Sequence, residues 1–175
     1  MLASDDAENS SYGANNIRRS ADGRADDIFE LSARAYDLGL RDDAVFWFYN
    51  AKNRAILLRE VINLDDGRFF EVKSAIGAFI KLVGDVVNPY AFCDIKKQQD
   101  IMAKSLEWSK ANVYEAMFLP EFESPHADRK AALVKAIEAL EAHVQKEKDY
   151  FLDEENLAKF KAMRKQNGTD EKFCF

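Results

Sequence analysis

The segment from Gly39 to Arg54 constrains the fold of this chain more than any other part, because it combines helical spacing with densely placed aromatic side chains. Ala44, Phe48 and Ala51 are separated by four and then three positions, so a helix places them on one face. Small alanines on that face allow another helix to approach closely, and the phenyl ring fills the remaining space. The segment therefore predicts the second helix of a tightly packed helical hairpin.

Apolar residues recur at helical spacing along most of the chain, while the long alternating Val, Ile and Thr stretches typical of sheets are absent. This pattern predicts an all-α fold, a compact bundle of about six helices that follow one another in antiparallel order. We expect the helices to cover approximately 24–38, 42–63, 68–86, 94–111, 126–144 and 153–166, the fifth beginning at Ser124 or His126. The third is expected to be largely buried, with Gly77 allowing close contact, and to end before the Asn88-Pro89-Tyr90 break.

Residues 1–22 are polar and acidic, with Tyr12 as almost the only large apolar side chain. Such a segment buries too little surface to offset its ordering entropy, so we expect a flexible N-terminal arm. Residues 23–175 are expected to form a single all-α domain, since this length supports one substantial core.

The net charge of -6 disfavours binding to nucleic acid or to an anionic membrane and favours a basic partner. No segment reaches membrane-spanning length and no signal peptide is visible, so the sequence indicates either the cytoplasm or, if a signal peptide has been removed, the periplasm.

Cys93 and Cys174 lie 81 positions apart, and neither His126 nor His143 shares a metal-ligand spacing with them. We therefore expect two free thiols, no metal site and no cofactor. The alternative is a single disulfide, which would imply an oxidising compartment.

Two resemblances suggest a function. Ala44, Phe48 and Ala51 resemble the second-helix signature of tetratricopeptide and Sel1-like repeats, with Leu38-Gly39 at the turn. The segments 42–49, 88–94 and 106–108 resemble a group of uncharacterised bacterial helical proteins, some of which act as immunity proteins beside secreted antibacterial toxins, including those of type VI secretion. The second resemblance implies a protein that binds a toxin and has no catalytic role.

Two groups of residues are candidates for contact with a partner. Trp47 and Tyr49 point away from the Ala44 face, so they either contact a partner or lie between the first and third helices. Acidic residues at helix starts could add to a carboxylate-rich surface, and the alternative is that they only cap their helices. The loop 115–125 is less easily explained in that way, because it is expected to expose apolar and aromatic side chains among glutamates. The candidates in this loop are Glu115, Phe118, Glu121, Phe122 and Glu123.

No catalytic arrangement is recognisable, and His143 is expected to be a structural histidine near the core. Three functions remain open. The first is an immunity protein that neutralises a cognate toxin. The second is an adaptor that holds a peptide or helix in an open concave face, and the third is an enzyme whose pocket the sequence does not reveal.

Overall fold

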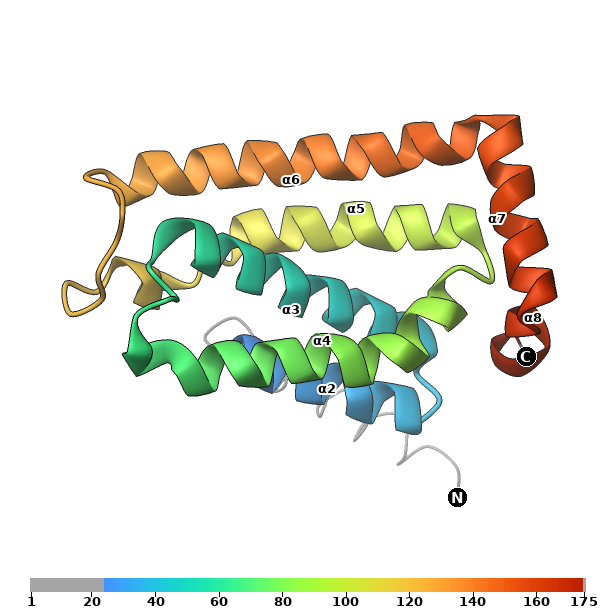
Figure 1. The fold of residues 1–175 in the computed structure, drawn as a ribbon, viewed down its shortest axis with the longest axis horizontal. Coiled ribbons are helices and arrows are strands. Elements are labelled where there is room, and N and C mark those ends of the chain that lie inside the picture. Colours follow the sequence, from blue (N-terminus) through green and yellow to red (C-terminus); the bar gives the residue numbers. More distant parts are fainter. Residues whose placement is uncertain (1–23, 175) are drawn as a thin grey trace, which may run out of the picture.

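The computed structural model describes residues 24–174, and that part of the chain consists of helices without a β-strand (Figure 1). The α-helices are α2 (Ala25–Asp37), α3 (Arg41–Val61), α4 (Phe70–Ala91), α5 (Ile95–Ala111), α6 (Arg129–Leu152), α7 (Glu154–Gln166) and α8 (Thr169–Phe173). The short 3-10 helices η1 (Gly67–Phe69) and η2 (Glu115–Phe118) lie in the connections. The all-α prediction is confirmed, whereas the predicted arm, residues 1–22, lies outside the described residues.

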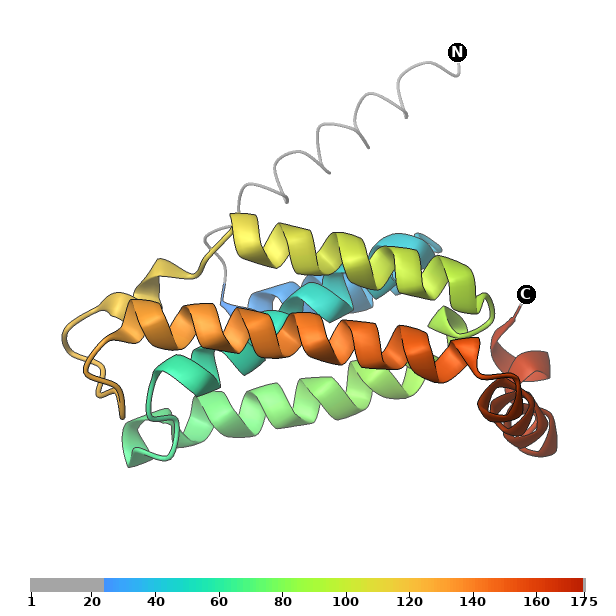
Figure 2. The same cartoon turned by 90° about the horizontal axis from the view of Figure 1, so that it is seen from above.

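Helix α3 is the centre of the bundle, because it contacts α2, α4, α5 and α6. Most of its side chains are buried, as expected for a helix that has neighbours on all sides. Figures 1 and 2 show α5 and α6 running in opposite directions beside α3, while α7 crosses the end of α6.

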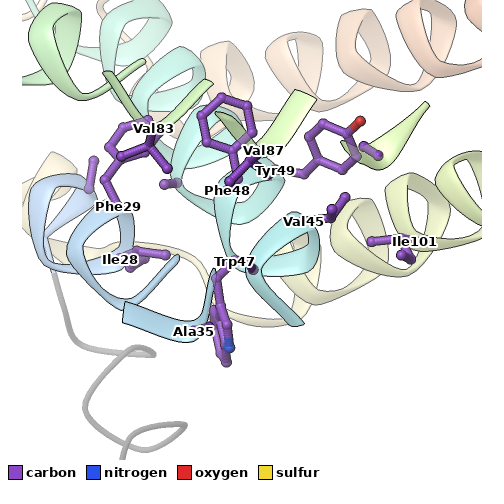
Figure 3. Packing of buried hydrophobic residues seen from close by; sticks show 14 of the residues in the cluster. Ile28, Phe29, Ala35, Val45, Trp47, Phe48, Tyr49, Val83, Val87 and Ile101 are labelled. Atoms are coloured by element: carbon purple, nitrogen blue, oxygen red, sulfur yellow. The ribbon is translucent and has the colours of Figure 1, made fainter. Parts of the chain in front are cut away.

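The first hairpin, α2 and α3, packs as the alanine spacing predicts. Ala44, Phe48 and Ala51 are all 0% exposed. The Ser32 hydroxyl donates to the carbonyl oxygen of Ala44 at 2.7 Å, which ties the two helices together. Phe48 meets Phe29 edge to face, with the ring centroids 5.7 Å apart (Figure 3).

Two clusters of buried apolar side chains form the core, and α3 contributes to both. The first core cluster joins α2, the first half of α3, α4 and the start of α5, and includes Ile28, Phe29, Phe48, Val83, Val87 and Ile101. The second core cluster joins the last half of α3 to η2 and α6, and includes Leu57, Val61, Met117, Leu133 and Leu140.

The contact between α3 and α5 includes buried polar side chains beside the apolar ones. The side-chain oxygen of Asn50 accepts hydrogen bonds from Ser105 at 2.9 Å and Ser109 at 3.3 Å. One turn further along α3, the buried guanidinium of Arg54 donates to the carbonyl oxygen of Asn112 at 2.8 Å. Because a buried polar group left unpaired is costly, these bonds fix how α5 lies against α3.

The predicted break at Asn88-Pro89-Tyr90 is wrong, since α4 continues through Pro89 to Ala91. A proline so close to the end of a helix removes only one backbone hydrogen bond. Contacts on either side also hold this last turn in place. The Tyr90 hydroxyl donates to Asp42 at 2.8 Å, and Arg164 donates to the carbonyl oxygen of Pro89 at 2.9 Å.

The close contact predicted at Gly77 lies instead at Gly84. Gly77 is exposed and has open space where a Cβ would stand, whereas a Cβ on Gly84 would lie 3.0 Å from the Phe48 ring. Helix α4 is also less buried than expected, because its outer face leaves Leu82 67% exposed.

Helix α6 begins at Arg129 and not at Ser124 or His126. Asp128 caps it, with its side chain accepting the N–H of Ala131 at 3.0 Å. The predicted inner seam is confirmed at Leu133, Ala136 and Leu140, which are buried. His143, however, is exposed on α6, so the prediction of a core histidine is wrong.

The expectation of two free thiols is wrong, because Cys93 and Cys174 form a disulfide with 5.5 Å between their Cα atoms. The short helix α8, which the sequence analysis did not predict, follows the left-handed turn at Gly168 and brings Cys174 back to the bundle.

Candidate functional site

The connection between α5 and α6, residues 112–128, is held in one shape by the guanidinium of Arg129. This group donates to the carbonyl oxygens of Met117 at 3.1 Å and Leu119 at 2.7 Å, and also to that of Phe122. One side chain therefore gathers three backbone acceptors, and hydrogen bonds from a charged donor are stronger than neutral ones. We call residues 112–128 the tethered loop.

The far end of the tethered loop is fixed to the end of α3. The Ser124 hydroxyl donates to the carbonyl oxygen of Val61 at 2.6 Å, and the His126 ring donates to that of Glu60 at 2.9 Å. The N–H of Asn63 donates in turn to the carbonyl oxygen of Glu123 at 3.0 Å. The loop thus satisfies the carbonyl groups that the last turn of α3 leaves without a helical partner.

The acidic side chains of the tethered loop face solvent. Glu115, Glu121 and Glu123 are exposed, and Leu119 beside them is 42% exposed. Within residues 24–174, Glu123 has a distant ion pair to Arg68 at 3.9 Å.

The aromatic side chains of this loop behave differently from the prediction. Phe118 and Phe122 are half-buried against the second core cluster, and Met117 is only 1% exposed. Phe122 meets Phe69 at a centroid distance of 5.2 Å. The two phenylalanines therefore anchor the loop, and only their partly open edges remain for a partner.

A groove adjoins the tethered loop, between the end of α3 and the first half of α6. We call it the side groove; its volume is about 780 Å³. Its floor is formed by small side chains of α6, including Ala132, Ala136 and Ala139. His126 and Asp128, at the end of the tethered loop, also line it, so the groove begins where the loop meets α6.

Trp47 and Tyr49 lie in the core, at 8% and 6% exposure (Figure 3). They are buried as the alternative predicted, but both contact α5, the fourth predicted helix. The Trp47 ring packs edge to face on Trp108 at 5.5 Å. The Tyr49 hydroxyl accepts a hydrogen bond from Gln98 at 2.9 Å, and burial raises the pKa of this hydroxyl well above its usual range. Both side chains therefore pack within the protein and expose little surface that a partner could contact.

Arg129 is the residue of this surface that the sequence analysis missed, and a signal for it was present. It is the first residue of α6, where the helix dipole disfavours a cation. A positive side chain at such a position must gain its stabilisation elsewhere, and here it does so from the loop carbonyl groups.

No group of three or more His, Cys, Asp or Glu side chains gathers in residues 24–174 in a way that could hold a metal ion. None of the helices there combines the length and apolar character needed to cross a membrane.

Comparison with known proteins shows that the chain is similar to a bacterial protein. No protein-family model matches the chain, and no solved structure matches it significantly. A protein of Haemophilus influenzae, described as "Uncharacterized protein", is 39% identical over 148 residues, which make up 85% of this chain and 57% of that protein. The chain thus spans little more than half the length of this relative, and the similarity supports the expected resemblance to bacterial helical proteins.

Proposed function

We propose that this chain is a non-catalytic protein-binding protein, an immunity protein that binds and neutralises a cognate antibacterial toxin. The observation that carries the proposal is the tethered loop, which Arg129 holds by three carbonyl groups while Glu115, Glu121 and Glu123 face solvent. The relative from Haemophilus influenzae is consistent with a bacterial origin and says nothing of the partner.

A loop that is already ordered before the partner binds is suited to tight binding. Association costs free energy for every side chain and loop segment that becomes ordered, and a rigid loop avoids much of that cost. Carboxylates around the partly exposed Leu119 offer the combination of an apolar contact and a charged rim that protein interfaces commonly show.

The charge of the loop indicates a basic partner surface. Three exposed carboxylates on a chain of net charge -6 would attract Lys and Arg on a toxin and raise the association rate. The disulfide between Cys93 and Cys174 favours an oxidising compartment such as the periplasm, where a delivered toxin would be met.

The test uses the product of a toxin gene adjacent to the gene of this protein. The triple variant Glu115→Gln, Glu121→Gln, Glu123→Gln should weaken binding by roughly 10- to 100-fold at low salt, mainly through slower association, as loss of interface charges does. Surface plasmon resonance at several salt concentrations measures both rate constants.

The matched control carries Glu71→Gln, Glu138→Gln and Glu171→Gln, which are exposed glutamates away from the loop. Both variants change the net charge from -6 to -3, because each removes three negative charges. Equal affinities of the two variants would exclude the tethered loop as the contact surface.

An adaptor that holds a peptide is the second candidate, and the side groove favours it. The groove has a volume of about 780 Å³ and a floor of alanines, which would admit a narrow chain segment. In that case the peptide would bind in the side groove and not beside α2 and α3, because α4, α5 and α6 cover α3. Lys135→Glu, at the groove, would weaken peptide binding without affecting a partner that contacts only the loop.

A further inference from the structure

Helices α7 and α8, which we call the C-terminal lobe, contribute little to the core. Arg164 is the only buried residue of α7, and α8 has none. Neither core cluster includes a residue of the lobe. An element that buries so few apolar side chains is expected to open more easily than the bundle.

One polar contact and a small aromatic group hold the lobe against the bundle besides the disulfide. The Arg164 guanidinium donates to the carbonyl oxygen of Pro89 at 2.9 Å, while its bond to Asp170 at 2.6 Å joins α7 to α8 within the lobe. Phe160 of α7 meets Phe92 and Phe151, with centroid distances of 5.3 and 5.1 Å. All three rings are only half-buried.

The disulfide joins the end of the lobe to the bundle at an accessible place. Cys93 lies in the turn between α4 and α5, Cys174 follows α8, and both residues are exposed. The chain therefore enters the lobe from α6 and is fastened again at its far end. Without the second attachment, α8 would depend mainly on its contacts with α4 and α7.

A groove of about 720 Å³ lies between the lobe and the bundle, and we call it the end groove. The start of α5 and the end of α6 form its fixed wall, and α7 and α8 form the other. Phe92, Phe151 and Phe160 line it. Movement of the lobe would therefore change both the shape of this groove and the exposure of its aromatic side chains.

We propose that the Cys93–Cys174 disulfide is a redox latch, which holds the C-terminal lobe against the bundle when oxidised and releases it when reduced. A dithiol donates two electrons and two protons: the S–S bond breaks, Cys93 and Cys174 become thiols, and the dithiol becomes a disulfide. The bundle of α2 to α6 keeps its fold in both forms, because its two core clusters lie outside the lobe. The latch does not depend on the identity of any partner.

Hydrogen–deuterium exchange of the full chain, oxidised and after treatment with dithiothreitol, tests the latch. In the reduced protein, amides of residues 154–173 should exchange faster by about tenfold or more, while those of residues 45–61 in α3 should keep their protection. Intact mass after alkylation confirms that both thiols have formed. The Cys93→Ser, Cys174→Ser variant should match the reduced protein and show no response to dithiothreitol.

Two results would overturn the proposal. Equal exchange of residues 154–173 in both forms would mean that Arg164 and the three phenylalanines hold the lobe without the disulfide. Faster exchange throughout α3 as well would mean that the disulfide stabilises the whole molecule and is not a local latch.

Discussion

At the scale of single residues, the tight contact between α3 and α4 depends on a glycine that the sequence pattern did not single out. Gly84 of α4 lies where a Cβ would stand 3.0 Å from the Phe48 ring and 3.2 Å from the Asn88 amide nitrogen. Gly77 lies two turns earlier in the same helix and has open space around it. Both glycines have a helical backbone, and only Gly84 has close neighbours. Substitution of Gly77 therefore controls for the effect of replacing glycine in this helix.

Gly84→Ala should lower the free energy of unfolding by about 1–3 kcal/mol, because Phe48 is fully buried and cannot move aside without disturbing the first core cluster. Gly77→Ala should raise it by about 0.5–1 kcal/mol, since alanine loses less backbone entropy in a helix. Urea unfolding followed by circular dichroism measures both. A gain in stability from both substitutions would show that the α3–α4 contact is looser than the distances indicate.

At the scale of elements, the sequence predicted helices well where the side chains act locally. Asp94 and Asp153, where two helices were expected to begin, cap α5 and α7, with their carboxylates accepting backbone N–H groups three residues on. Ser124 could cap a helix equally well, but its hydroxyl instead donates a hydrogen bond to the carbonyl oxygen of Val61, which lies 63 positions away in the chain. Local patterns contain no information about such a distant partner.

The same limit applies to the candidate site. The exposed carboxylates of the tethered loop could be predicted from composition, but the burial of Phe118 and Phe122 could not, because it depends on Arg129 and on the second core cluster. Likewise, a separation of 81 positions says nothing of the 5.5 Å between the Cα atoms of Cys93 and Cys174.

Arg129→Ala should release the tethered loop and lower the free energy of unfolding by about 2 kcal/mol. This value lies within the range that hydrogen bonds to charged groups contribute to stability. Hydrogen–deuterium exchange of residues 113–125 should increase, and thermal unfolding reports the loss of stability. Arg59→Ala is the matched control, because Arg59 is exposed and pairs with Glu60 at the surface. Surface pairs of this kind contribute little, so the control should stay within about 0.5 kcal/mol of the wild type.

At the scale of the whole molecule, α3 couples the two halves of the core. Its first half lies in the first core cluster and its last half in the second, so neither cluster can lose its order without exposing part of the same helix. The described bundle is therefore expected to unfold in one cooperative transition, with only the C-terminal lobe able to open separately.

Met117→Ala tests this coupling from the second core cluster, where Met117 is 1% exposed. The substitution should lower the free energy of unfolding by about 2–5 kcal/mol, as large-to-small changes in a core do. Tryptophan fluorescence, which reports on Trp47 in the first core cluster, should show the same shifted midpoint as circular dichroism. Met163→Ala is the control, because Met163 is 49% exposed on α7 and its loss should change stability by less than about 0.5 kcal/mol. Separate midpoints for the two probes would show that the clusters unfold independently and that α3 does not transmit order between them.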